Sequence, residues 1–195
     1  MPGENKASDN APRETKPAET APCPARPEET DCRPAGHAYL FGLGSPHGSD
    51  RLGWLAADAL QGALAGRDDV SVECLAQPVD LFLHAVTASD RLLLVDAMRG
   101  QGPPGTLRVF APGELPESGG RLSSLSSLSS HGLDLAGTLA LAEALGLFRG
   151  GIRIIGIEMP ADMPKEEGPD APAPRLDGAT TRRLMEAVLG WLDGR

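Results

Sequence analysis

The chain contains 195 residues, of which 41% are hydrophobic and 23% are charged, values that are ordinary for a globular protein. Its formal net charge of −9 argues against a nucleic-acid-binding protein and against a polybasic membrane-surface protein, because both depend on clustered basic side chains. No apolar run approaches the roughly 20 residues that a membrane-spanning helix needs, and the first residues lack the apolar core of a secretory signal. With only three cysteines, which favours a reducing compartment, we expect a cytoplasmic monomer that binds neither nucleic acid nor membrane.

Residues 1–36 differ in composition from the rest of the chain. They contain seven prolines, many charges and almost no large apolar side chain. Such a segment buries too little apolar surface to offset the entropy lost on ordering. The composition therefore predicts a disordered tail over residues 1–36 and a single domain over residues 37–195, close to the usual domain size.

The domain shows an alternation of apolar runs and amphipathic stretches. Short apolar runs predict buried strands, and a spacing of three to four residues predicts helices. In chain order the sequence predicts a strand at 37–44, a helix at 51–65, a strand at 70–75, a short helix or turn at 80–88, a strand at 91–96, a loop at 100–105, a strand at 106–110, a serine-rich loop at 122–130, a helix at 131–147, a strand at 151–158, a proline-rich loop at 159–177 and a helix at 178–192.

This order indicates a fold class and a core. Strands that are apolar throughout are covered on both faces, as in parallel sheets. The pattern predicts an α/β domain of three layers, with a mostly parallel five-stranded sheet between helices. The core face of the first helix is predicted to hold Leu52, Leu55, Ala59, Leu60 and Ala63, and that of the helix at 131–147 to hold Leu135, Leu139, Ala142 and Leu145.

Three polar residues fall where such a sheet usually carries its site, at the carboxyl ends of strands. Asp50 lies in the loop after the first strand, Asp96 ends the most apolar strand, and His131 begins a helix. Each has a simpler explanation, as a helix cap, a turn residue and a loop histidine respectively. If they converge, two carboxylates and an imidazole would suit a divalent transition metal with open coordination positions.

The sequence gives less support to a serine hydrolase or a phosphate-binding site. No serine lies in a G-x-S-x-G elbow, and the glycines at 42–44 are not followed by a phosphate-binding pattern. His47, in the same loop as Asp50, and Glu158, at the end of a strand, are secondary candidates, and an exposed surface position is the favoured interpretation for both. The apolar neighbours of His84 favour a packing role, and Cys74 is expected to be a small buried hydrophobic residue.

Four motifs then resemble those of one known family, the hydrogenase maturation proteases. The family pattern G-x-G-N-x-x-x-x-D-[DE]-x-x-G is similar to residues 42–53, which are one residue shorter. An apolar strand that ends in Asp-Ala appears at 92–97, S-S-H-G-L at 129–133, and a G-I-E-x-P-like motif at 156–160. The order of the four motifs is that of the family, and they cover about residues 39–160.

The resemblance implies an endopeptidase that trims the C-terminus of the large-subunit precursor of nickel-iron hydrogenases. It implies that Asp50, Asp96 and His131 are ligands of nickel that arrives with the precursor, and that Asp50 and Asp96 serve in catalysis, so that the enzyme is classed with aspartyl proteases. Ser45 stands where the family usually has Asn, and Ser49 where it has the first acid of a pair. Asp50 is preferred to Arg51 as the ligand, since a loop absorbs a deletion more easily than a helix start.

Two rival interpretations stay open at this point. The altered Ser45 and Ser49 also suit a non-catalytic chaperone or checkpoint module that senses nickel on the same fold. An unrelated α/β hydrolase or nucleotide-binding domain would instead have a deep apolar pocket away from Asp50 and Asp96.

Overall fold

The computed structural model describes residues 36–45, 51–100, 102–115, 134–160 and 175–194. In chain order the elements are β1 (Ala38–Leu43), α1 (Leu52–Ala63), β2 (Val70–Leu75), the 3₁₀ helix η2 (Pro78–Leu83), β3 (Arg91–Met98), β4 (Leu107–Phe110), the 3₁₀ turn η3 (Pro112–Glu114), α3 (Leu135–Ala144), β5 (Ile152–Glu158) and α4 (Gly178–Leu192). The predicted tail over residues 1–36 and the serine-rich loop at 122–130 lie outside the described residues, apart from Gly36, and stay predictions.

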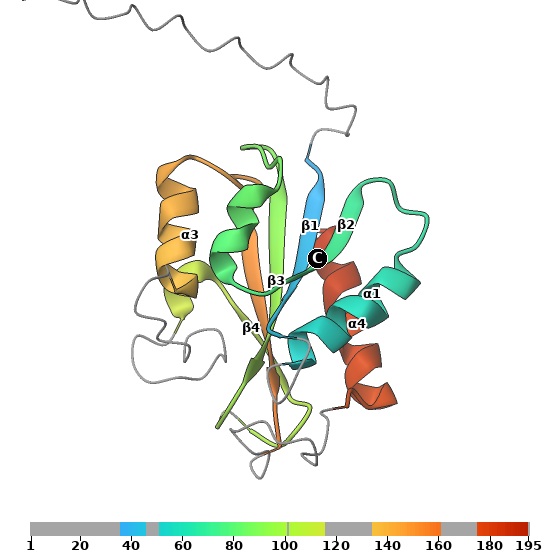
Figure 1. Cartoon of the computed structure of the whole chain (residues 1–195). Coiled ribbons are helices and arrows are strands. Elements are labelled where there is room, and N and C mark those ends of the chain that lie inside the picture. Colours follow the sequence, from blue (N-terminus) through green and yellow to red (C-terminus); the bar gives the residue numbers. More distant parts are fainter. Residues whose placement is uncertain (1–35, 46–50, 101, 116–133, 161–174, 195) are drawn as a thin grey trace, which may run out of the picture. The chain divides into compact units, whose positions relative to one another are not determined.

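The strands form one sheet in the order β2-β1-β3-β5-β4. Three neighbouring pairs are parallel, and β4 alone runs antiparallel to β5. The carboxyl ends of β1, β3 and β5 therefore meet at one edge of the sheet, drawn at the bottom of Figure 1. The predicted mostly parallel, five-stranded sheet is confirmed.

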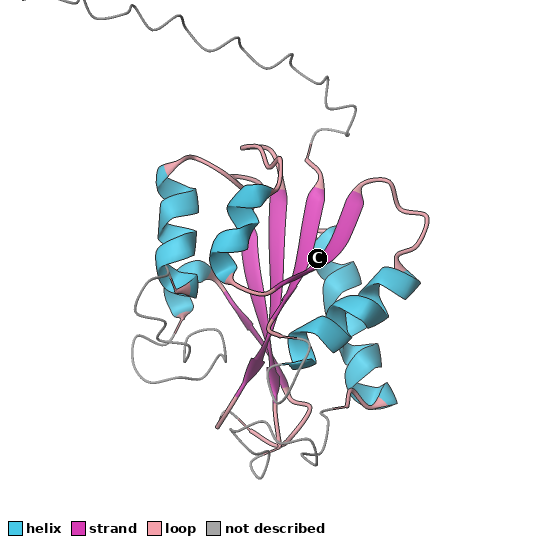
Figure 2. Ribbon diagram, in the orientation of Figure 1, coloured by secondary structure: helices cyan, strands magenta, loops and turns pink. Residues whose placement is uncertain are grey.

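Helices cover both faces of the sheet (Figure 2). Side chains alternate along each strand, so β3 sends Leu93 and Val95 into the core beneath α1 and α4, and Leu92 and Leu94 into the core beneath α3 and η2. The predicted arrangement of a sheet between helices is thereby confirmed.

The contact between α1 and β1 depends on two glycines. A Cβ atom on Gly42 would overlap the Gly53 carbonyl oxygen and lie 2.9 Å from the Cβ of Ala57. A Cβ atom on Gly53 would overlap the Leu43 carbonyl oxygen and lie 2.7 Å from that of Val95. The helix backbone therefore rests directly on the strands, and this places the start of α1 beside the end of β1.

This close approach corrects the predicted core face of α1. The buried residues in this helix are Leu52, Gly53, Ala56, Ala57 and Leu60, whereas the predicted Ala63 is exposed and Leu55 and Ala59 are only half-buried. The prediction from periodicity placed mainly large apolar side chains on the core face of the helix. The helix instead turns its small residues inward, because only they permit such a short distance between helix and strand.

Two predicted boundaries and one core residue were also wrong. The third strand continues to Met98, so Asp96 lies inside it and does not end it. Helix α3 begins at Leu135 and not at His131, because Asp134 caps it.

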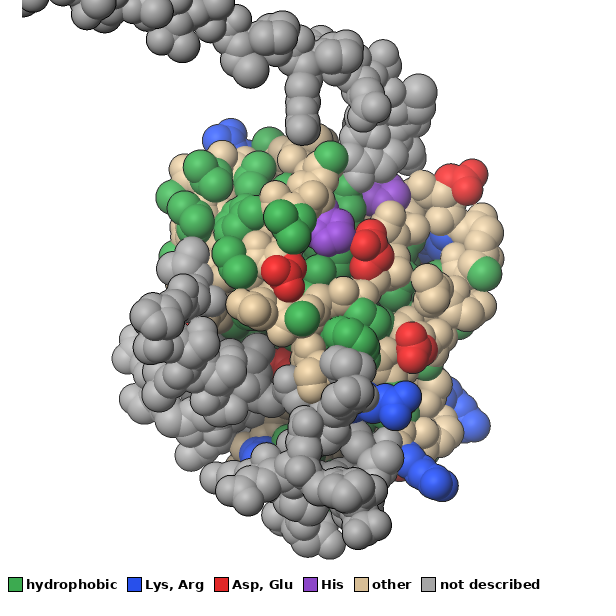
Figure 3. All heavy atoms as spheres, viewed as in Figure 1, with side chains coloured by type: hydrophobic (Ala, Val, Ile, Leu, Met, Phe, Trp, Pro, Cys, Tyr) green, Lys and Arg blue, Asp and Glu red, His purple; other side chains and the backbone are tan. Residues whose placement is uncertain are grey.

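Leu145, expected in the core, is 60% exposed. It lies where the helix ends, before Gly146, whose φ is +71°. With the exposed Leu83 and Leu141 it adds to the apolar surface over η2 and α3 at the upper left of Figure 3.

Among the described helices, none has both the length and the apolar character needed to cross a membrane.

Substitution of the contact glycine should destabilise the fold, and substitution of an exposed glycine in the same helix should not. Gly53→Ala forces a side chain against two backbone carbonyls that cannot rotate away, and should lower the free energy of unfolding by about 3 kcal/mol or more. Gly62→Ala, which meets nothing within 4 Å, should raise it by up to about 1 kcal/mol, since alanine favours a helix. Urea unfolding of both variants measures the difference, and equal effects would contradict the close packing.

Candidate active site

The carboxyl edge of the sheet carries one buried acid on its most apolar strand. Asp96 is completely buried at 0% exposure, and its side chain lies on the same face as those of Leu92 and Leu94. The backbone N–H of Ala97 donates a hydrogen bond of 2.7 Å to Asp96 Oδ1. A buried carboxyl group on an apolar strand is costly unless polar or charged partners compensate it, which marks Asp96 as the first candidate for chemistry.

The strand next to Asp96 has a glycine beside it. Asp96 pairs in register with Gly156 on β5, and Gly156 pairs with Arg108 on β4. Residues directly opposite each other share a face of the sheet, so Asp96 and Arg108 lie on one face with a glycine between them. At this level, β5 therefore places no side chain between the acid and the basic residue.

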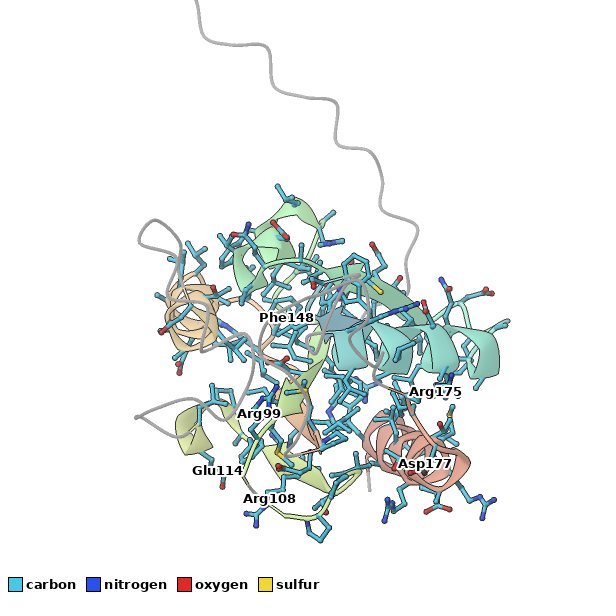
Figure 4. The ribbon with its side chains drawn as sticks, turned by 60° about the horizontal axis from the view of Figure 1, so that its bottom comes forward. Arg99, Arg108, Glu114, Phe148, Arg175 and Asp177 are labelled. Atoms are coloured by element: carbon cyan, nitrogen blue, oxygen red, sulfur yellow. The ribbon has the colours of Figure 1, made fainter. Side chains whose placement is uncertain are left out.

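Figure 4 looks onto this edge of the sheet. It shows Arg99, Arg108 and Glu114 on one side, from β4 and the segments that flank it, and Arg175 and Asp177 on the other side, at the start of α4. The side chains of Arg108, Arg175, Arg182 and Arg183 are exposed, and basic side chains also gather at the lower right of Figure 3. The edge of the sheet that holds Asp96 is thus bordered by arginines, although the whole chain is acidic.

Glu158 corrects a prediction. The sequence suited a solvated strand end, but Glu158 is only 4% exposed, and its Oε1 accepts a hydrogen bond of 2.5 Å from the Gly100 N–H. Glu158 pairs in register with Met98, two residues beyond Asp96 and Gly156. It therefore lies on the same face and at the same edge as Asp96, on the neighbouring strand. The period of two between Gly156 and Glu158 could have indicated this placement.

The other two predicted ligands, Asp50 and His131, lie outside the described residues, as does His47. The described chain stops at Ser45 on one side of Asp50 and resumes at Arg51 on the other. Gly44 has a φ of +141° and donates its N–H to the Leu75 carbonyl oxygen at 3.1 Å. The loop with Asp50 thus leaves from the carboxyl end of β1, next to β3, while the exact placement of Asp50 stays a prediction.

Helix α3, which follows His131 in the chain, begins toward the same edge of the sheet. Helix α3 leads into β5, which is parallel to β3, so the helix begins toward the carboxyl edge and returns the chain to the opposite one. Its first residue follows Asp134, whose Oδ1 accepts the Gly137 N–H at 2.7 Å. His131 precedes this cap by three residues, and its convergence with Asp96 stays a prediction.

The described residues contain two other histidines and one cysteine, Cys74. The ring of His84 lies 4.7 Å from that of Phe41 and its Nδ1 is 3.7 Å from Glu73 Oε2, which confirms the predicted packing role. His37 is buried, with Nε2 2.8 Å from Ser71 Oγ. Cys74 is only half-buried, contrary to the prediction, and desolvation raises the pKa of its thiol.

The described residues hold no group of three or more histidine, cysteine, aspartate or glutamate side chains with the geometry of a metal site. Within these ranges, Asp96 and Glu158 are the acids that share one face at the carboxyl edge. Their hard oxygen atoms can bind a divalent cation or accept a proton. A site with three such donors at this edge would therefore need at least one donor from outside the described residues, and Asp50 and His131 are the predicted ones.

A comparison with protein families matches residues 76–168 to the family described as hydrogenase maturation protease, HycI. This stretch contains Asp96, His131 and Glu158, whereas Asp50 precedes it. The resemblance to the hydrogenase maturation proteases is confirmed. The predicted class of enzyme, a maturation endopeptidase, is confirmed with it at the level of family and fold.

Solved structures show the same fold. The hydrogenase maturating endopeptidase HybD from E. coli superposes with a TM-score of 0.54 at 20% identity, covering 81% of this chain and 93% of that one. The [NiFe] hydrogenase maturation protease HybD from Thermococcus kodakarensis gives a TM-score of 0.53 at 17% identity, with 80% and 98% covered. HycI from the same organism gives 0.51 at 19% identity, with 80% and 89% covered. No curated protein sequence matches the chain.

Removal of the cap on α3 should loosen the helix that follows His131. Asp134→Ala leaves the Gly137 N–H without its side-chain acceptor and should lower the free energy of unfolding by about 1 kcal/mol. Asp134→Asn retains an acceptor at that position and should lower the free energy of unfolding much less. Chemical unfolding of the two variants gives the comparison, and a full-sized loss in Asp134→Asn would show that the cap does not act through this hydrogen bond.

The cap of α4 should make part of the stability dependent on pH. Hydrogen bonds from Thr180, its backbone N–H first, lower the pKa of Asp177. The folded protein therefore holds this proton less tightly than the unfolded chain, so the contribution is complete above about pH 4 and disappears as the pH falls through the folded-state pKa. The thermal midpoints of the wild type and Asp177→Asn should differ at pH 6 and converge toward pH 2. A constant difference would contradict this assignment.

Proposed function

We propose that this protein is an endopeptidase that removes the C-terminal extension from the nickel-loaded large-subunit precursor of a nickel-iron hydrogenase. The observation that carries the proposal is the position of Asp96. It is buried at the carboxyl edge of the sheet, within the stretch that matches the maturation protease family, and at the place where the resemblance in sequence expects a nickel ligand.

In this proposal nickel belongs to the substrate. It arrives in the precursor, and Asp50, Asp96 and His131 provide oxygen and nitrogen ligands that complete its coordination. A site without thiolates holds a divalent cation weakly when the precursor is absent, because few of its donors are soft or pre-organised. The enzyme would thereby select precursor that has already received its metal and ignore precursor that has not.

The reaction hydrolyses one peptide bond. Water adds to the carbonyl carbon, the carbon–nitrogen bond breaks, and a new carboxylate and a new amine result. Asp50 and Asp96 are the candidate groups that accept the proton of the attacking water and return it to the leaving nitrogen. The cation of the substrate can support this step by polarising the carbonyl oxygen.

Loss of the charge on Asp96 should abolish processing without loss of the fold. Asp96→Asn keeps the size of the side chain and an acceptor for the Ala97 N–H, but it removes the anionic ligand and proton acceptor. Cleavage of nickel-loaded precursor, followed by mass spectrometry, should slow at least about a hundredfold, and His131→Ala should behave similarly. Glu143→Gln, on the exposed surface of α3, is the matched control and should cleave at the wild-type rate.

A second candidate function has a specific observation in its favour. Ser45 and Ser49 replace polar and acidic residues of the family pattern, which suits a nickel-sensing chaperone that binds the precursor without cutting it. The same experiment separates the two functions. A stable complex with nickel-loaded precursor of unchanged mass would reject the protease and support the chaperone.

A further inference from the structure

The loop that follows Asp96 is held by a second buried acid. We infer that Glu158 is a positioning residue, whose carboxyl group fixes the loop between β3 and β4 as a wall beside Asp96. The inference rests on the proposed function in so far as it concerns cleavage, and on the contacts of Glu158 in so far as it concerns the loop.

Glu158 contacts both ends of this loop. Its side-chain Oε1 accepts the N–H of Gly100 at 2.5 Å, two residues after β3 ends. Its backbone carbonyl oxygen accepts the N–H of Gly105 at 2.8 Å, and its own N–H donates to the Thr106 carbonyl oxygen at 2.9 Å. The two backbone bonds continue the β4–β5 ladder, whereas the side-chain bond holds Gly100 near the beginning of the loop.

The far end of the loop has an additional anchor on α4. The Gly105 carbonyl oxygen accepts a hydrogen bond of 3.0 Å from Arg183 Nη2 and a longer one of 3.5 Å from Thr180 Oγ1. Gly105 has a φ of +77°, and a Cβ atom there would overlap Thr180 Oγ1. Conformation and packing therefore both require glycine, and the end of the loop stays in place even if the side chain of Glu158 changes.

Gly100, near the beginning of the loop, does not have the packing constraint that Gly105 has. Gly100 is exposed, has a φ of +75°, and a Cβ atom on it would meet nothing within 4 Å. A glycine without packing contacts has many accessible conformations. The hydrogen bond to Glu158 restricts this freedom, and because the acceptor is buried, water does not readily take its place.

The position of this bond connects it to the candidate site. Met98 and Glu158 are in register, two residues beyond Asp96 and Gly156, so Glu158 lies on the face and at the edge of the sheet that Asp96 occupies. Gly156 places no side chain beside Asp96 on that face. A peptide that reached Asp96 from this edge would pass the start of the loop, so its binding would depend on where Gly100 is held.

The test compares Glu158→Ala, Glu158→Gln and the surface control Glu143→Gln in the full chain. Glu158→Ala should lower kcat/KM for nickel-loaded precursor by about tenfold to a hundredfold, mainly by raising KM, because the substrate site is misplaced while the groups that react remain. Glu158→Gln keeps an acceptor for Gly100 and should restore most of the loss. A kcat/KM for Glu158→Ala within twofold of wild type, or a Gln variant as poor as the Ala variant, would overturn the inference.

Amide hydrogen exchange provides a readout that does not need cleavage. Glu158→Ala should accelerate exchange at Gly100 at least tenfold, and leave β1 and α1 protected as in the wild type. Unchanged exchange at Gly100 would overturn the inference, and global loss of protection would show that Glu158 supports the whole fold and not the loop. If the wild-type protein fails to shorten the precursor, the proposed function fails, and the exchange experiment still decides whether Glu158 holds the loop.

Discussion

A single buried carboxyl group on the central strand imposes the main constraint on this molecule. Asp96 occupies β3 among leucines and valine, at 0% exposure, where an unpaired charge would cost several kcal/mol. It lies near the carboxyl edge, where backbone N–H groups, loops and arginines are available to compensate it. The Ala97 N–H is one such partner, and a cation delivered by a substrate would be another.

The rest of the edge is built around this residue by parts of the chain that are distant in sequence. The Gly42–Gly53 contact brings α1 down onto β1 and β3, and so fixes where the loop that contains Asp50 must begin and end. Gly156 lies beside Asp96 without a side chain, and Arg108 follows on the far side of Gly156. Glu158 and Arg183 hold the two ends of the β3–β4 loop. Each contact is modest alone, and in the proposed function they would together limit the positions of a peptide bound at this edge.

Most of the architecture could be predicted from the sequence because buried parallel strands have a strong apolar signal. The runs at β1, β3 and β5 predict their own location, and their alternation with helices predicts the layers. The core face of α1 could not be predicted in the same way, since Gly53 and Ala57 pack inward for reasons of distance and not of hydrophobicity. The antiparallel direction of β4 was not predicted either, although the short connection from Met98 to Leu107 could have indicated it, because a parallel crossover needs about a dozen residues or more.

The site was predictable in part, for a related reason. Asp96 is conspicuous as an acid in an apolar run, but Glu158 resembles any charged residue at a strand end until the register with Met98 shows that it faces the same side. The family match covers residues 76–168, which include Asp96 and His131. Asp50 lies outside this range, so its assignment depends on the motif resemblance alone.

X-ray absorption spectroscopy of the nickel in a loaded precursor tests the central claim most directly. If Asp96 coordinates that nickel, mixing the precursor with the wild-type protein should add an oxygen ligand to the nickel, and the spectrum should change accordingly. Mixing with Asp96→Asn should still give a complex, but the spectral change should be smaller. Identical nickel spectra with the two proteins would contradict the account.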